Sequence, residues 1–96
     1  SGDRDRIMKW HIEISKASQK FIKKNGIRDD EIISHLRRAI YKLQGKEGKV
    51  DLKKMKGDWK DFFRIRTGKM RIIFKTDFDH RKIFVDRIDF RGDVYK

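Results

Sequence analysis

Residues 59–76, WKDFFRIRTGKMRIIFKT, decide the fold, because they predict two short strands joined by a two-residue turn at Gly68-Lys69. Apolar and cationic residues alternate on both sides of the turn, as they do along a strand that buries one face. A two-residue turn gives one register in which both patterns agree, and Gly68 suits the first central position of a type II′ turn. The predicted pairs are Thr67 with Met70, Arg66 with Arg71, Ile65 with Ile72 and Phe63 with Phe74.

This register places Arg66 directly opposite Arg71, and such a pair of like charges costs a fraction of ~1 kcal/mol. Two interpretations remain open. Either Arg64, Arg66 and Arg71 form a platform whose planar guanidinium groups bind an anion, or they lie on a solvated face where each pairs with a distant carboxylate. We favour the platform, because arginine outnumbers lysine on this face.

The first half of the chain predicts one strand and a short helix. Residues 8–14 alternate between apolar and polar side chains, which is typical of a half-buried strand. Ser15 is the expected N-cap of the helix, and Asn25-Gly26 is its expected end. The residues expected to face inward are Ala17, Phe21 and Ile22.

A second helix is expected after Asp29 or Asp30, either of which can cap it, and Gly45 suits its end. Its apolar residues recur at helical spacing. They are Ile32, Ile33, Leu36, Ala39, Ile40 and Leu43.

Residues 44–49 are expected to form a flexible connector, and residues 50–60 supply lysines just before the central hairpin. Residues 82–90 predict a further strand after a polar turn. Its alternation places Ile83 and Val85 on one face and Phe84, Asp86 and Ile88 on the other. A four-residue turn over 77–80 would pair Phe74 with Ile83, Ile72 with Val85 and Arg71 with Asp86, whereas a five-residue turn would reverse the faces.

The predicted fold class is therefore α+β: an N-terminal strand, a helical hairpin, and then a three- to four-stranded antiparallel sheet with one open basic face. Residues 1–7 are interpreted as a tag remnant or loose tail, and residues 8–96 as a single domain. The open face is expected to carry Arg64, Arg66, Arg71 and Lys75.

The net charge of +12 and the isoelectric point near 10.2 favour a polyanionic partner. The chain has no cysteine, so thiol nucleophiles and zinc–thiolate sites are excluded. His11, His35 and His80 lack metal-ligand spacing, and no phosphate-binding loop pattern occurs, so we expect neither a metal nor a nucleotide cofactor. No long apolar run or signal-peptide pattern occurs, so we expect a cytoplasmic protein without a membrane partner.

Three segments in a fixed order resemble the RelE/ParE superfamily of bacterial and archaeal toxins. They are Lys54-Met55-Lys56-Gly57, then Phe63 to Phe74, then Phe90 to Tyr95, and the resemblance extends over essentially the whole chain from Met8. It implies a compact toxin fold over residues 8–96. In RelE-like members it also implies cleavage of messenger RNA in the ribosomal A site.

The resemblance also implies site residues. Arg64, Arg66 and Arg71 match basic strand residues of the family, and Arg91 and Tyr95 match its terminal arginine and tyrosine. Phe90 stands where many members have histidine, which leaves the variant in which tyrosine and cations perform the chemistry. Expected catalytic residues are Arg66, Arg71, Arg91 and Tyr95, and expected RNA-binding residues are Lys53, Lys54, Lys56, Arg64 and Lys75.

The expected function is that of the toxin in a type II toxin–antitoxin system, a ribosome-dependent mRNA endoribonuclease that uses the 2′-hydroxyl and no metal. Its expected partners are a cognate antitoxin, the ribosome and mRNA, with the toxin itself a monomer. Two alternatives stay open because a fold does not settle a function. One is a ParE-like inhibitor of DNA gyrase without nuclease activity, and the other is an RNA-binding module without chemistry.

Overall fold

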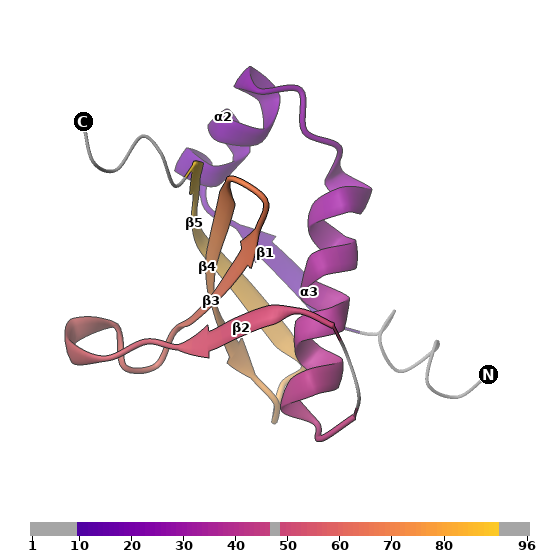
Figure 1. The fold of residues 1–96 in the computed structure, drawn as a ribbon, viewed down its shortest axis with the longest axis vertical. Helices are drawn as coiled ribbons and strands as arrows, with labels where there is room; N and C mark the ends of the chain where they lie inside the picture. The colour runs from indigo at the N-terminus through magenta and orange to yellow at the C-terminus, as the bar shows by residue number, and fades with distance from the viewer. Residues whose placement is uncertain (1–9, 47–48, 91–96) are drawn as a thin grey trace.

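A five-stranded sheet in the order β1-β5-β4-β3-β2 runs through the computed structural model, which describes residues 10–46 and 49–90 (Figure 1). The α+β class predicted above is confirmed. The strands are β1 (His11–Ile14), β2 (Asp51–Lys54), β3 (Phe63–Thr67), β4 (Met70–Asp77) and β5 (Lys82–Phe90). The helices of this part of the chain are α2 (Lys16–Lys24), α3 (Asp29–Leu43) and a 3-10 turn, η1 (Gly57–Trp59).

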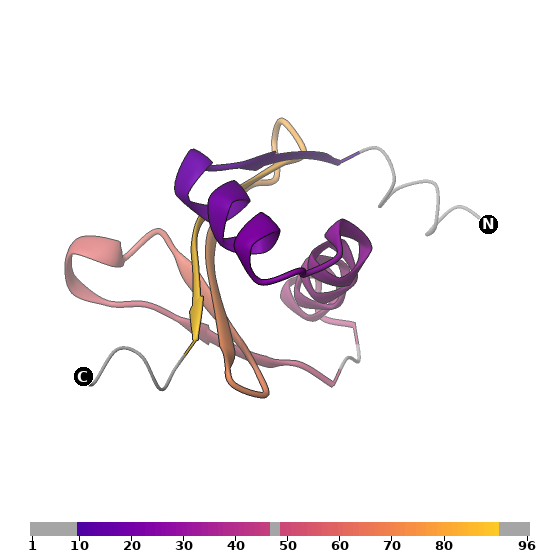
Figure 2. The ribbon, with the colours of Figure 1, turned by 90° about the horizontal axis from the view of Figure 1, so that it is seen from above.

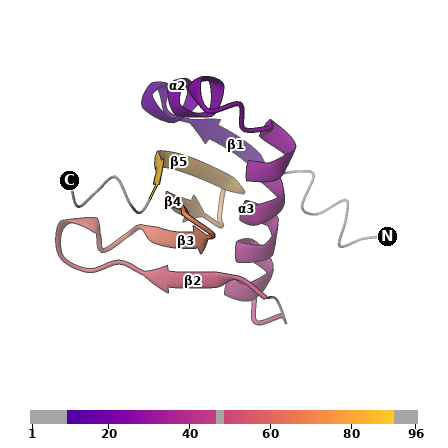
Figure 3. The ribbon, with the colours of Figure 1, turned by 45° about the horizontal axis from the view of Figure 1, so that its top comes forward.

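The sheet is mixed, because β1 pairs in parallel with β5 while the other neighbouring strands are antiparallel. The helices α2 and α3 lie on one side of it, and the loop that carries η1 extends from the other side (Figure 2). β1 and β2 form the two edges (Figure 3). The predicted tail over 1–7 and the segment from 91 onward lie outside the described residues.

The predicted hairpin is confirmed in every pair. Thr67 faces Met70, and the pairing continues without a break to the opposite end of β3. Gly68 has a φ of 57°, a left-handed value that glycine adopts without the steric cost that a Cβ would bring. The turn and the alternation therefore act together to set which residues face the helices.

The predicted register between β4 and β5 is wrong. Phe74 faces Val85 rather than Ile83, since the four-residue turn spans 78–81 rather than 77–80. The register then shifts between Ile73 and Phe74, so that Ile72 faces Ile88 and Arg71 faces Asp89. The strand β5 therefore has one extra residue, Asp86, between its two paired segments, which is the pattern of a β-bulge.

The bulge changes which side chains of β5 enter the core. Ile83 and Val85 are buried on the helix side as predicted, but Ile88 is also buried there, contrary to the simple alternation. The extra residue at Asp86 moves the period by one position. The core cluster extends from the helices to the sheet: Ile22, Ile32, Leu36, Ala39, Ile40, Ile65, Met70, Ile72, Phe74, Ile83, Val85 and Ile88.

Both helices form where predicted, with changes at their first turns. Ser15 caps α2 by accepting a hydrogen bond from the Ser18 backbone N–H at 3.1 Å. Ala17 is exposed, and the buried position in that turn is Ser18 instead. In α3 the capping residue is Arg28, not Asp29 or Asp30, and no side chain caps the helix. The acidic residues lie inside its first turn, where the helix dipole favours negative charge.

The segment 50–60 contains a strand that the sequence did not predict. β2 pairs with β3, and Leu52 faces Ile65 while Lys53 faces Arg64. Asp51 faces Arg66 in the same ladder. The basic side of the sheet therefore extends over one more strand than expected and gains an acidic residue.

The second side of the sheet is only partly open. Ile73 belongs to this side by alternation, yet it is only 6% exposed. Aromatic residues gather on the same side, with the rings of Trp59 and Phe62 4.9 Å apart. Lys75 lies over the rings of Phe62 and Phe84 at 5.6 and 5.8 Å. This aromatic cluster lies over one end of the face.

Candidate nucleic-acid interface

The side of the sheet opposite the helices carries its charges in cross-strand rows. One row crosses β2, β3, β4 and β5, and its residues are, in that order, Asp51, Arg66, Arg71 and Asp89. We call these four residues the arginine–aspartate row. Two cations lie at its centre and one carboxylate lies at each end, so its formal charge is zero.

Both arginines of this row make ion pairs with their flanking aspartates. Arg71 donates through Nε and Nη2 to the two carboxylate oxygens of Asp89, at 2.9 and 3.0 Å. Arg66 donates through Nε to Asp51 at 3.1 Å. The Arg71–Asp89 pair is the less accessible, with side chains 22% and 24% exposed. The second interpretation given above, arginines paired with distant carboxylates, therefore applies to Arg66 and Arg71.

The pKa of the Asp51 carboxyl is lowered from its ordinary value, chiefly by the hydrogen bond from Arg66. The charges of Arg66 and Arg64 act in the same direction, and desolvation opposes them. A lowered pKa means that the ionised carboxylate is the form that the site favours. Asp51 is therefore negatively charged at neutral pH and remains available to pair with arginine.

The neighbouring row has a different charge balance. It consists of Lys53, Arg64, Ile73 and Arg87, which face one another across β2, β3, β4 and β5. We call its three charged members the cationic row. No carboxylate faces them in this register, and the Arg87 guanidinium lies 5.8 Å from the centre of the Trp59 ring. Positive charge is therefore concentrated one row away from the balanced arginines.

Arg64 is the member of the cationic row with an unsatisfied donor. Its Nε is buried and has no hydrogen-bond partner among the described residues. Leaving a buried donor unpaired typically costs about 1–3 kcal/mol, and more for a charged group. An anionic acceptor that reached Arg64 would remove this cost.

A pocket of about 230 Å³ lies beside Arg64, at the free edge of β2. It brings together four of the predicted RNA-binding residues, although register puts Lys54 on the opposite face of β2 from Lys53. Its lining is Lys53, Lys54, Met55, Lys56 and Arg64. Four cations around one small pocket make a site suited to a phosphate group.

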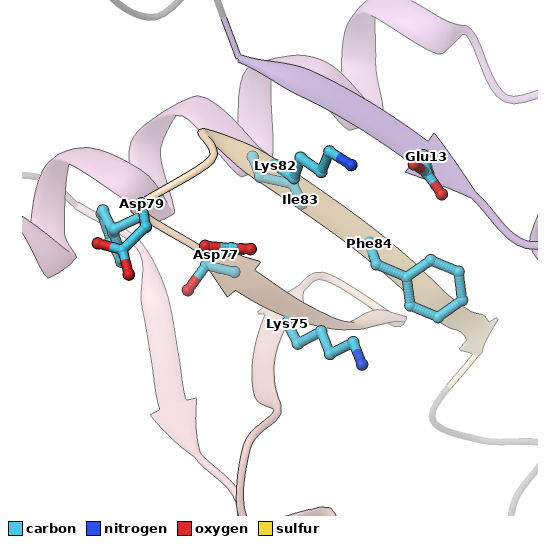
Figure 4. Close-up of a pocket in the computed structure, with 9 residues that line it drawn as sticks. Glu13, Lys75, Asp77, Asp79, Lys82, Ile83 and Phe84 are labelled. Atoms are coloured by element: carbon cyan, nitrogen blue, oxygen red, sulfur yellow. The ribbon is translucent and has the colours of Figure 1, made fainter.

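Lys75, the remaining predicted RNA-binding residue, lies apart from this pocket. It lines a pocket of about 690 Å³ over β4, β5 and β1, together with Phe84 and Glu13 (Figure 4). Asp77 lies near the other end of this pocket, and the pKa of its carboxyl is lowered chiefly by a hydrogen bond from His80. This pocket mixes both signs of charge, so it is a weaker anion site than the pocket at Arg64.

Arg91 and Tyr95 lie outside the described residues. Phe90, the last described residue, packs against Phe21 of α2 with ring centres 4.9 Å apart. The position where many members of the resembled family carry histidine is therefore an aromatic contact with a helix.

Residues 10–46 and 49–90 contain no group of three or more histidine, aspartate or glutamate side chains arranged to hold a metal ion. Over the same residues, neither helix has both the length and the apolar character needed to cross a bilayer.

Comparison with known proteins shows similarity in structure only. No family model and no curated protein sequence matches the chain. Among solved structures, the archaeal RelE–RelB complex from Pyrococcus horikoshii OT3 contains a chain with 21% identity and a TM-score of 0.53, with 86% of this chain and 96% of that chain covered. The YoeB–YefM toxin–antitoxin complex from Staphylococcus aureus contains a chain with 14% identity and a TM-score of 0.60, with 85% of this chain and 97% of that chain covered.

A third similar structure is a YoeB/ParE toxin from Agrobacterium tumefaciens, with 15% identity, a TM-score of 0.59, and coverage of 83% of this chain and 97% of that chain. The chain thus has the fold of the RelE/ParE toxins, as its sequence motifs indicated. At these identities the similarity establishes the fold and leaves the activity to be argued from the residues.

Sequence reasoning placed three arginines on one face of the sheet but missed the acidic partners of two of them. Arg64, Arg66 and Arg71 lie on one face, as predicted. The roles of Asp51 and Asp89 were missed, because one requires the unpredicted strand β2 and the other requires the bulge in β5. Arg87 was missed for the second reason. The sequence does contain a signal for the bulge. In residues 87–90, RIDF, apolar and charged residues alternate, and this alternation agrees with that of residues 83–85 only if Asp86 is skipped.

Proposed function

We propose that this protein is the toxin of a toxin–antitoxin system and acts as a ribosome-dependent mRNA endoribonuclease. The observation that carries the proposal is the unsatisfied Nε of Arg64, on the side of the sheet away from the helices, in a pocket that three lysines also line. Clustered arginine and lysine side chains favour a phosphate backbone, and a strongly basic chain favours a polyanion overall. The proposed RNA-binding residues are Lys53, Lys54, Lys56, Arg64 and Lys75.

The proposed reaction needs no metal. A base removes the proton of the RNA 2′-hydroxyl, the 2′-oxygen attacks the adjacent phosphorus, and the bond from phosphorus to the 5′-oxygen breaks as that oxygen takes a proton from water. Tyr95 is the proposed base, a role that requires clustered cations to lower the pKa of a tyrosine from its ordinary value near ~10. Arginine is a poor acid or base, so Arg66 and Arg71 are assigned to the charge that develops on the phosphate, and Arg91 to the leaving group or phosphate.

Phe90 supports this choice of groups over one based on histidine. Its ring contacts Phe21 and carries no titratable atom, so it supplies no proton. If Arg71 stabilises developing charge, Arg71→Ala should reduce the cleavage rate about 100- to 1000-fold, the effect of losing one preorganised donor. The variant should keep its fold, because Arg71 lies outside the hydrophobic core.

The proposed partner in the cell is an acidic antitoxin, and the proposed site of action is the cytoplasm, where ribosomes translate mRNA. Similar structures include complexes of RelE with RelB and of YoeB with YefM. A basic surface on this chain suits an acidic segment that folds on binding. Co-expression with the product of the adjacent gene, followed by affinity capture, tests this partner directly.

Primer extension on a translated message tests the activity. Purified protein, ribosomes and mRNA should give cuts within the translated region, and omission of ribosomes should abolish them. The second candidate, inhibition of DNA gyrase, is favoured by one observation, the phenylalanine in place of histidine. A parallel reaction with gyrase and supercoiled DNA separates the two, since DNA breaks without RNA cuts would establish the alternative.

A further inference from the structure

The arginine–aspartate row has a structure that a simple phosphate-binding face would not need. Each of its arginines already has a carboxylate partner at hydrogen-bonding distance. The Arg71–Asp89 pair uses two parallel N–H···O contacts, which is the geometry that arginine also uses for phosphate. Asp89 therefore occupies the position on Arg71 that a phosphate would take.

The two aspartates have a structural role that explains their location. Arg66 and Arg71 face each other as like charges, and a carboxylate on each outer side offsets their repulsion. The same arrangement weakens the attraction of the row for an approaching anion. A phosphate that reaches Arg71 must displace Asp89 and also overcome its repulsion.

We propose that Asp51 and Asp89 limit the affinity of this protein for RNA, because they hold Arg66 and Arg71 in the free protein and are exchanged for backbone phosphates in the complex. The proposal rests on the proposed function, and it assigns the two carboxylates a role in substrate binding. RNA first binds the cationic row, whose members face no carboxylate. The exchange at the neighbouring row follows.

The partial exposure of the pairs allows this exchange. The side chains of Arg66 and Asp51 are 37% and 51% exposed, so water can solvate the released carboxylate. Exposed ion pairs of this kind contribute little net free energy, which makes them exchangeable. Arg71 and Asp89 are less exposed and form the stronger pair. Exchange at Arg66 should therefore require less free energy than exchange at Arg71.

The test is the affinity of Asp51→Asn and Asp89→Asn for a fluorescent single-stranded RNA oligonucleotide, measured by anisotropy at several salt concentrations. Each change keeps the side-chain shape and removes one negative charge. Asp79→Asn is the matched control, because Asp79 is exposed in the turn between β4 and β5 and its replacement changes the net charge equally. Thermal unfolding of each variant establishes that it is folded.

Asp51→Asn should bind RNA about fivefold more tightly than the wild type, as expected when a competing exposed ion pair worth roughly 1 kcal/mol is removed, and Asp89→Asn should gain at least as much, because its pair is less exposed. The slope of log affinity against log salt should stay close to that of the wild type, because the complex makes the same phosphate contacts with and without the aspartates. The Asp79→Asn control should change little. If the RNA affinity of the control rises as much as that of the row variants, the effect comes from net charge alone, and the proposal is overturned.

Weaker or unchanged RNA binding by a folded Asp89→Asn protein would also overturn it, because that result means the carboxylate only orients Arg71. If Asp89→Asn fails to fold, the more exposed Asp51→Asn variant decides the question by the same criteria. The cleavage assay is a separate readout. A protein that binds RNA with these changes in affinity but cuts no message would refute the proposed nuclease and leave the exchange supported.

Discussion

Arg66 and Arg71 face each other across β3 and β4, and their like charges are tolerated because Asp51 and Asp89 pair with them from the outer strands. The aspartates lie far from the hairpin in sequence, and each comes from a different strand. A repulsive pair in a local hairpin is thus balanced by tertiary contacts. Removing an aspartate and removing its arginine partner should therefore change the free energy of unfolding by different amounts.

Asp89→Ala should destabilise the protein by about 1 kcal/mol more than Arg71→Ala does. Removing the aspartate takes away a charge that offsets the Arg66–Arg71 repulsion, whereas removing Arg71 eliminates the repulsion together with the ion pair. Urea unfolding of both single variants and the double variant gives the coupling free energy. If both single changes lower the free energy of unfolding equally, the Arg66–Arg71 repulsion does not contribute to stability.

Ser15→Ala should lower the free energy of unfolding by about 1–2 kcal/mol. Its hydroxyl accepts from the Ser18 N–H and donates to the backbone carbonyl of Asp86 at 2.8 Å. One side chain therefore caps α2 and ties it to the bulge of β5. Ser34→Ala, a change inside α3, is the control and should have a smaller effect. Equal effects would contradict the capping role.

The bulge in β5 predicts that Ile88 is a core residue. Ile88→Ala should cost about 2–4 kcal/mol, as expected for a buried isoleucine that leaves a cavity. The adjacent change Arg87→Ala should cost far less, because Arg87 lies on the exposed side. Denaturant unfolding compares them. A small loss of stability for Ile88→Ala together with a large loss for Arg87→Ala would support simple alternation along β5 and contradict the bulge.

The hairpin could be predicted because its turn length and two alternating patterns act over only a few residues. The β4–β5 register could not, since four-residue turns at 77–80 and at 78–81 both pair apolar faces. The extra residue of the bulge that follows, Asp86, accepts a hydrogen bond from Ser15, 71 residues away in the sequence. Local sequence therefore predicts β5 itself but not the partner of each of its residues.

β2 was missed for a different reason. Its sequence DLKK has one apolar residue and two lysines, which is a weak strand signal. Charged residues are typical of edge strands, because they discourage pairing with other chains. Without β2, the pairing of Asp51 with Arg66 and the pocket at Arg64 could not be foreseen. The assignments of Arg91 and Tyr95 stay predictions.

RNA and ribosome binding should depend strongly on salt. Contacts with phosphates release counterions, and a protein that makes several of them loses affinity steeply between about 50 and about 200 mM salt. Sedimentation with ribosomes over this range measures the loss. Arg64→Gln should reduce the salt slope by about 0.7, the contribution of one single-strand phosphate contact. A flat dependence for the wild type would mean that the charge of +12 serves solubility alone.

The most direct test of the account is the rate at which wild-type protein, Arg64→Gln and Arg38→Gln cut mRNA on programmed ribosomes. Arg38 is exposed on α3, on the other side of the sheet, so its replacement changes the net charge equally without touching the cationic row. We predict cuts by the wild type and by Arg38→Gln at similar rates. Arg64→Gln should be slower by about tenfold to a hundredfold at limiting protein concentration, the value of a charged hydrogen bond. An absence of cuts by the wild type, or an undiminished rate in folded Arg64→Gln, would contradict the account.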